Sequence, residues 1–189
     1  MNSPVSITMP IIETERSMML LLAPEKAQLM LDYYLENRMH LNPWEPQRDS
    51  GFYRLEHWQQ QLTDNRRLFA IGSALKLVVL NKNASEVIGV CNFTNIQRGI
   101  FQACNLGYSV AAKYQGQGYM REILQAALAY VFDELNLHRV MANYMTSNQR
   151  SAALLKQLGF KQEGLAKSYL KIAGIWQDHV LTAKINPAH

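Results

Sequence analysis

Two glycines, one residue apart, separate an apolar stretch from an amphipathic one. They are Gly116 and Gly118, with residues 106–110 before them and residues 120–135 after them. Glycine lets backbone N–H groups approach a ligand closely, and the start of a helix carries about half a positive charge. A strand, this turn and a helix therefore predict an anion site suited to phosphate. On spacing alone, a plain strand-to-helix turn explains the glycines equally well.

Further polar residues occupy places where chemistry is feasible. Asn148 and Ser151 stand at the start of a predicted helix that ends at Leu158, with Gly159 directly after it. Such residues are typical helix caps, and a cap does not exclude contact with a ligand. Glu45 lies in a loop with two prolines and is a candidate partner for a cation. Its alternative interpretation is an exposed loop carboxylate.

The elements that must position these residues follow from the periodicity of apolar side chains. The stretches with a strand pattern are residues 18–23, 68–80, 87–95, 101–110, 139–145, 160 onwards and 175–183. The stretches with a helix pattern are residues 24–40, 53–65, 120–135 and 148–158, and the loop 42–46 is expected not to be helical. Their order predicts an α+β fold with a mixed, mostly antiparallel sheet of about seven strands. We expect helices on both faces and one β-α-β crossover.

Composition narrows the class of protein. The chain has 189 residues, 48% of them hydrophobic, and a net charge of +4, which suits one globular domain over residues 1–189. No basic patch interleaved with aromatic residues points to nucleic acid. Cys91 and Cys104 are expected to be free buried thiols, and nothing has metal-ligand spacing. Without a signal peptide or an apolar run of 18 residues, we expect a cytoplasmic protein.

Three motifs together resemble the GNAT superfamily of acetyltransferases. Gln115 and Gly118 match its acetyl-CoA signature, whereas Met120 stands where the superfamily usually has a small residue. Residues 106–110 resemble its fourth strand, and residues 148–160 resemble a later helix motif. The resemblance implies the GNAT fold and an acetyl-CoA-dependent N-acetyltransferase.

Other segments narrow the resemblance to one group of enzymes within the superfamily. Residues 42–46, 88–90, 104–110, 141–145 and 176–180 are similar to the bacterial ribosomal-protein alanine N-acetyltransferases, over nearly the full chain. This similarity implies acetyl transfer to the N-terminal α-amine, of alanine, in a small-subunit ribosomal protein. The enzyme would bind this ribosomal protein either free or on an assembling ribosomal subunit. We expect no direct nucleic-acid site and no membrane association.

The resemblance also implies a place for the cofactor. The pantetheine arm would lie between two splayed strands, along the backbone of Tyr108, Ser109 and Val110. Asn148 would bind the same arm. The residues implied around the pyrophosphate are Gln115, Gly116, Gln117, Gly118, Tyr119, Met120 and Arg121.

Proton transfer is harder to assign. The resemblance makes Ser151 the candidate donor to the leaving thiolate. Glu45, in the proline-rich loop, is our candidate for binding the amine or acting through water. Tyr169 and Asp178 are weaker candidates. The positions where relatives often carry a Glu or Tyr for proton transfer hold Asn105, Asn143 and Leu155.

The missing base fits one kind of acceptor better than another. An α-amine has a pKa near 7.7–8.0, against about 10.4 for lysine, so roughly a tenth of it is neutral at pH 7. Two alternatives stay open. The acceptor could be a polyamine, an amino sugar or an antibiotic amine, which favour an acidic pocket that only Glu45, Asp49 and Glu56 could supply. The chain could also be a non-catalytic coenzyme A-binding ribosome-assembly factor.

Overall fold

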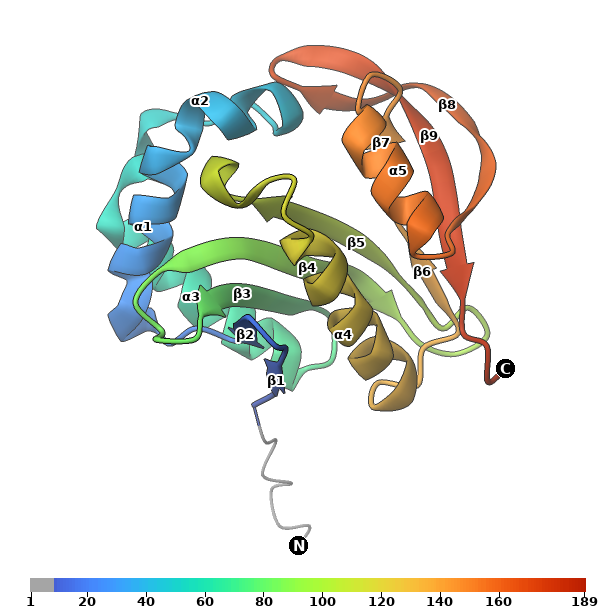
Figure 1. The fold of residues 1–189 in the computed structure, drawn as a ribbon, viewed down its shortest axis with the longest axis horizontal. Helices are drawn as coiled ribbons and strands as arrows, with labels where there is room; N and C mark the ends of the chain where they lie inside the picture. The colour runs from blue at the N-terminus through green and yellow to red at the C-terminus, as the bar shows by residue number, and fades with distance from the viewer. Residues whose placement is uncertain (1–8) are drawn as a thin grey trace, which may run out of the picture.

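The computed structural model describes residues 9–189, in which one sheet of nine strands forms the centre of the fold (Figure 1). The strands are β1 (Ile11–Glu13), β2 (Ser17–Leu20), β3 (Leu75–Asn81), β4 (Val87–Gln97), β5 (Ala103–Val110), β6 (Arg139–Met141), β7 (Tyr144–Met145), β8 (Lys161–Ile172) and β9 (Ile175–Ile185). Their order is β1-β2-β3-β4-β5-β6-β9-β7, and β8 pairs with β9. Neighbours are antiparallel except β5 and β6, which are joined by the predicted crossover.

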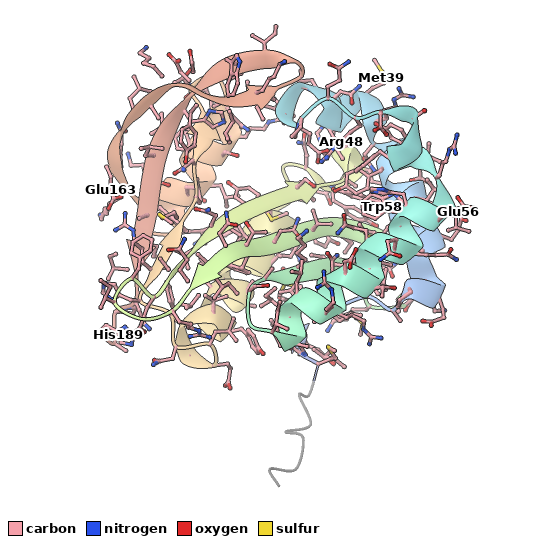
Figure 2. The ribbon with its side chains drawn as sticks, turned by 180° about the vertical axis from the view of Figure 1, so that it is seen from behind. Met39, Arg48, Glu56, Trp58, Glu163 and His189 are labelled. Atoms are coloured by element: carbon pink, nitrogen blue, oxygen red, sulfur yellow. The ribbon has the colours of Figure 1, made fainter. Side chains whose placement is uncertain are left out.

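Helices cover both faces of the sheet. They are α1 (Ala27–Glu36), α2 (Arg38–Leu41), α3 (Leu55–Ala70), α4 (Tyr119–Asp133) and α5 (Gln149–Gln157). Helices α1 and α3 lie on one face and α4 lies on the other. Seen from behind, α3 turns Trp58 toward the sheet and Glu56 away from it (Figure 2). The predicted mixed α+β arrangement, with helices on both faces of the sheet, is therefore present.

The alternation of side chains along β3 builds a core on each face. Leu75, Leu77 and Val79 belong to the apolar cluster that includes α4 and α5. Val78 and Leu80 belong to the cluster that includes α1 and α3. A strand buried on both faces reads as a nearly continuous apolar run, because neither set of side chains meets water.

The sheet opens between β5 and β7. Strands β5 and β6 pair only from Ala103 with Arg139 to Asn105 with Met141. Beyond Asn105, β5 continues to Val110 alongside β4 alone, while β7 pairs with β9. The backbone of residues 106–110 therefore has a sheet partner on one side, and its other side borders a gap.

The hairpin of β8 and β9 reaches over this gap (Figure 1). At its tip, the N–H of Ala173 donates to the carbonyl of Glu45 at 2.9 Å. This bond joins the hairpin to the loop after α2. The register of β8 against β9 shifts between Ala166 and Leu170, around Ser168, whose φ is 47°.

Several predicted elements need correction. The sheet has nine strands rather than about seven: β1 is only three residues long, and predicted strand 139–145 is divided into β6 and β7. The division comes at Ala142 and Asn143, which bond to the backbone of Thr182 instead.

Two boundaries are also wrong. Helix α3 extends to Ala70, so the strand predicted from residue 68 begins at Leu75. Asn42–Trp44 forms a 3-10 turn, because the fixed φ of Pro43 suits the first turn of a helix. The expectation of free, buried thiols at Cys91 and Cys104 is confirmed. Within residues 9–189, no helix is long and apolar enough to cross a membrane.

Candidate active site

Two cavities meet at the gap in the sheet. The larger cavity, about 840 Å³, lies toward the starts of α4 and α5, and the smaller cavity, about 290 Å³, lies toward β7, β9 and the loop after α2. Apart from the weaker candidates Tyr169 and Asp178, every predicted site residue except Gln117 lines the larger cavity. The residues that line both cavities are Trp44, Glu45, Tyr108, Ser109, Asn148 and Ser151.

The glycine turn forms one wall of the larger cavity. Gly116 and Gly118 have φ values of 71° and 80°, in the left-handed region that only glycine adopts freely. No hydrogen bond joins the N–H groups of residues 116–121 to an acceptor elsewhere in residues 9–189. These donors sit at the start of the 15-residue helix α4, where unpaired N–H groups favour an anion. Binding of a pyrophosphate at this turn stays a prediction.

An arginine far away in the sequence holds this turn. Arg16 follows β1, and its Nη1 donates to the carbonyl of Gln117 at 2.9 Å. Its Nε donates to Glu122 at 2.6 Å, and its guanidinium lies 4.1 Å from the ring centroid of Tyr119. Burial acts to raise the pKa of Glu122, but the Thr14 hydroxyl together with the backbone N–H and guanidinium of Arg16 lowers it overall. We call Arg16, Gln117, Tyr119 and Glu122 the Arg16 clasp.

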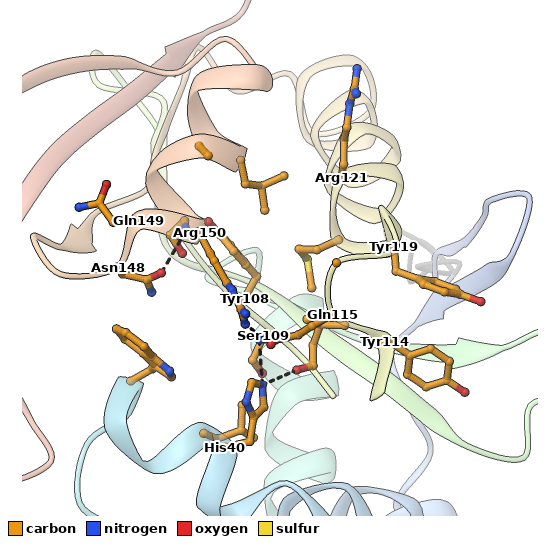
Figure 3. Close-up of a pocket in the computed structure, with 18 of the residues that line it drawn as sticks. His40, Tyr108, Ser109, Tyr114, Gln115, Tyr119, Arg121, Asn148, Gln149 and Arg150 are labelled. Atoms are coloured by element: carbon orange, nitrogen blue, oxygen red, sulfur yellow. Dashed lines mark hydrogen bonds between the residues drawn. The ribbon is translucent and has the colours of Figure 1, made fainter. Parts of the chain in front are cut away.

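The predicted contacts of the turn differ in detail. The amide of Gln117 turns back to the carbonyl of Lys113 at 2.6 Å, which accounts for its absence from the cavity wall. The side chain of Met120 is buried in the core beside α4 and also borders the larger cavity. Arg121 extends along α4, away from Gln115 and His40 (Figure 3).

Strand β5 presents backbone groups to the gap. The N–H of Ala111 donates to Ile88 of β4 at 2.8 Å. Because backbone groups alternate in direction along a strand, those of Tyr108 and Val110 face the other way. The carbonyl of Val110 indeed contacts His40 Nε2 at 3.2 Å. A pantetheine arm could therefore pair with Tyr108 and Val110, whereas Ser109 faces β4 and its hydroxyl is 2.8 Å from Tyr33.

A line of close polar contacts crosses the larger cavity. Gln115 Oε1 accepts from Arg150 of α5, and Gln115 Nε2 lies 3.1 Å from His40 Nε2 (Figure 3). Because His40 also contacts Val110, these side chains join α5, the glycine turn and α2. The sequence predicted a role only for Gln115. Arg150 lies within the helix motif of residues 148–160 but was given no role, and His40 belongs to no motif.

Helix α5 brings Ser151 to the junction of the cavities. Asn148 Oδ1 accepts from the Ser151 N–H at 3.0 Å, so Asn148 is the helix cap that the sequence suggested. The hydroxyl of Tyr108 is shielded from solvent and has no hydrogen-bond partner among residues 9–189. Burial raises the pKa of Tyr108 to about 12, and the neighbouring Ser151 hydroxyl opposes this rise. Sequence reasoning considered only the backbone of Tyr108 and missed its hydroxyl.

Glu45 also lines both cavities. Its carboxylate is 3.3 Å from Arg48, and its side chain is only 18% exposed. Burial raises the pKa of Glu45, while Arg48 works in the opposite direction. The interpretation of Glu45 as a freely exposed loop carboxylate is therefore wrong.

The weaker candidates lie outside both cavities. Asp178 accepts from Lys167 at 2.7 Å and from the Ser168 N–H at 2.8 Å, so it fixes the irregular part of β8. The Tyr169 ring lies 5.6 Å from that of His179, and its hydroxyl is 3.5 Å from Asn143. His179 lines the smaller cavity and was not singled out by the sequence.

Comparison with known proteins identifies the family. The acetyltransferase (GNAT) domain family matches residues 19–161. The chain belongs to the GNAT acetyltransferase family. This GNAT protein is 46% identical over 176 residues to the [ribosomal protein uS5]-alanine N-acetyltransferase of Escherichia coli K12, covering 93% of this chain and 91% of the relative.

Solved structures agree with this placement. The crystal structure of ribosomal-protein-S5-alanine acetyltransferase from Vibrio fischeri has a TM-score of 0.90 and 40% identity, with 94% of this chain and 97% of that chain covered. Mycobacterium smegmatis RimJ in complex with CoA-disulfide has a TM-score of 0.86 and 27% identity, covering 94% and 86%. The protein is therefore an N-acetyltransferase with the GNAT fold.

Proposed function

We propose that this GNAT enzyme transfers the acetyl group of acetyl-CoA to the N-terminal α-amine of alanine in a small-subunit ribosomal protein, namely uS5. The observation that carries the acceptor is the 46% identity to the Escherichia coli uS5-alanine acetyltransferase across 93% of this chain. We extend the proposal to action in the cytoplasm, on free uS5 or on an assembling subunit, by residues 1–189 as one domain.

The cofactor proposal is supported by the walls of the larger cavity. The free N–H groups of residues 116–121 would hold the pyrophosphate, and the backbone of Tyr108 and Val110 would hold the pantetheine arm. Acetyl-CoA supplies an activated acetyl group. A backbone N–H of β5 that faces the gap would stabilise negative charge on the acetyl oxygen during transfer.

The acceptor would enter by the smaller cavity, so that its amine reaches the junction of the two cavities. Of the described residues that line either cavity, only Glu45 carries a carboxylate. One carboxylate suits the single positive charge of a peptide N-terminus and would orient it. A polyamine would leave its additional charges without acidic partners, so the peptide acceptor is favoured.

Ser151 would protonate the sulfur that leaves. Ser151 lines both cavities, and the cap by Asn148 fixes the turn that carries it. Tyr108 keeps its proton at neutral pH because burial raises its pKa to about 12, so it would support Ser151 as a hydrogen-bond donor.

Acetylation of peptides tests the proposal. We expect a peptide with the N-terminal sequence of uS5, beginning with alanine, to gain about 42 Da at its α-amine, because one acetyl group replaces a hydrogen. An equimolar amount of free thiol should be released. The same peptide with a blocked α-amine and an internal lysine is the matched control. Spermidine at the same concentration distinguishes the polyamine alternative.

Gly118→Asp provides the control for the cofactor site. A carboxylate would meet the pyrophosphate, and Asp at φ 80° is strained, so coenzyme A binding measured by calorimetry should be lost. Faster acetylation of spermidine than of the alanine peptide would contradict the proposed acceptor. Coenzyme A binding without any thiol release would support the non-catalytic alternative instead.

A further inference from the structure

A buried histidine lines the smaller cavity. His179 of β9 is only 3% exposed and is paired with Met145 of β7. The carbonyl of Met145 accepts from the N–H of Asn148 at 2.8 Å, and Asn148 caps the helix turn that carries Ser151. His179 is therefore linked through one strand residue to the junction of the two cavities.

The hydrogen bond of His179 defines which ring nitrogen is free. Its Nδ1 lies 2.9 Å from the carbonyl of Gln177. A carbonyl can only accept, so Nδ1 carries the hydrogen, and Nε2 of the neutral ring has a lone pair. No hydrogen bond from another described residue reaches Nε2.

The hairpin holds the ring of His179 in place. The Tyr169 ring lies 5.6 Å away at 59°, and it comes from the irregular segment of β8. Asp178 fixes that segment by accepting from Lys167 and Ser168. Irregularities of this kind redirect side chains beside active sites.

The other ionisable residues at this cavity are poorer proton acceptors. They are Tyr34, Glu45, Arg48, Tyr108 and Tyr144, with Tyr169 against the His179 ring and the Asp178–Lys167 pair beside it in the hairpin. Tyrosine and arginine are already protonated at neutral pH. Glu45 is paired with Arg48.

We propose that Nε2 of His179 accepts the proton that the acceptor α-amine loses before it attacks. This inference rests on the proposed acetyl transfer and names the missing base. The amine enters as R–NH3+ and gives one proton to Nε2. The nitrogen then bonds to the acetyl carbon, and the bond from that carbon to sulfur breaks.

The remaining protons balance. The sulfur takes a proton from the Ser151 hydroxyl, which recovers it from the nitrogen, so the products are the amide and the free thiol. His179 releases its proton to solvent. One proton is lost for each acetyl group transferred.

His179→Gln tests the proposal, because glutamine keeps a hydrogen-bond donor but cannot take the proton. At pH 7 we expect kcat/KM for the alanine peptide to fall about 100-fold, the lower range for loss of a general base. The loss should shrink above the amine pKa of about 8, where the substrate is already neutral. Coenzyme A affinity should stay within about twofold, since His179 is outside the larger cavity.

Three further measurements make the outcome decisive. His189→Gln, at the C-terminus of the chain, is the matched control and should retain wild-type kinetics. His179→Asn is measured beside His179→Gln in case one of them misfolds. In His179→Ala, added imidazole should restore activity at pH 7.

A His179→Gln enzyme within threefold of wild type (about 0.7 kcal/mol), or a loss equal at every pH with no imidazole rescue, would overturn the role of His179. If wild type and His189→Gln both leave the peptide unmodified, the proposed function fails instead.

Discussion

At the scale of single residues, the side chains proposed to act in acetyl transfer lie around the junction of the two cavities. Sequence reasoning found Ser151, Glu45 and Asn148 because motifs and a proline-rich loop marked them. It missed the Tyr108 hydroxyl and His179, since a tyrosine or histidine in a strand reads as an ordinary half-buried residue. Only the tertiary structure shows that both side chains line the gap.

Replacing Ser151 separates a catalytic role from a capping role. The cap uses the Ser151 N–H, so Ser151→Ala keeps the bond to Asn148 and removes only the hydroxyl. We expect kcat to fall at least about tenfold, with a smaller rise in KM. Ser151→Thr restores a hydroxyl and should recover part of the rate. Unaltered kcat in steady-state kinetics of Ser151→Ala would remove the residue from the role of acid.

Glu45 gives a prediction for pH and stability. Burial raises its folded pKa above the unfolded value of about 4.3, so the folded state binds this proton more tightly. Its contribution to stability is therefore fully present below the unfolded pKa and is lost as pH rises through the raised folded pKa. Calorimetry should show that the Tm of wild type, relative to Glu45→Gln, declines from pH 4 upward. A Tm of wild type that rises with pH relative to that of Glu45→Gln would contradict this.

At the scale of elements, local patterns located the glycine turn and the helices that flank the cavities. The strand-to-helix turn was predictable because glycine spacing and the change of period are local signals. The Arg16 clasp was not predictable, because Arg16 and Gln117 are 101 residues apart in the sequence. Strands β1 and β7 have three and two residues, which is too short for an apolar period to be recognised.

The clasp predicts a selective effect on cofactor binding. Arg16→Gln removes the ion pair with Glu122 and the cation over Tyr119, so the turn should lose its fixed shape. We expect KM for acetyl-CoA to rise roughly tenfold, with kcat little changed. Lys82→Gln breaks another pair to the N-terminal hairpin, with Glu13, and should leave that KM unaltered. Equal effects of both substitutions would argue against a specific clasp.

At the scale of the whole molecule, the order of elements predicted the sheet, the crossover and the helices on both faces. The splay after Asn105 could not be derived from the sequence by physical reasoning. It depends on the change of partner along β9, which pairs with β7 at residues 179–180 and with β6 at residues 183–185. It also depends on the hairpin tip, which bonds to the Glu45 loop. These contacts join segments far apart in the chain.

The central claim is that the cofactor and the acceptor approach one junction from two cavities. A bisubstrate analogue, in which coenzyme A is joined through an acetyl bridge to the α-amine of an alanine peptide, would occupy both cavities at once. Calorimetry should show that it binds at least about 100-fold more tightly than coenzyme A, because linkage makes the second contact intramolecular. An affinity equal to that of coenzyme A alone would contradict the account.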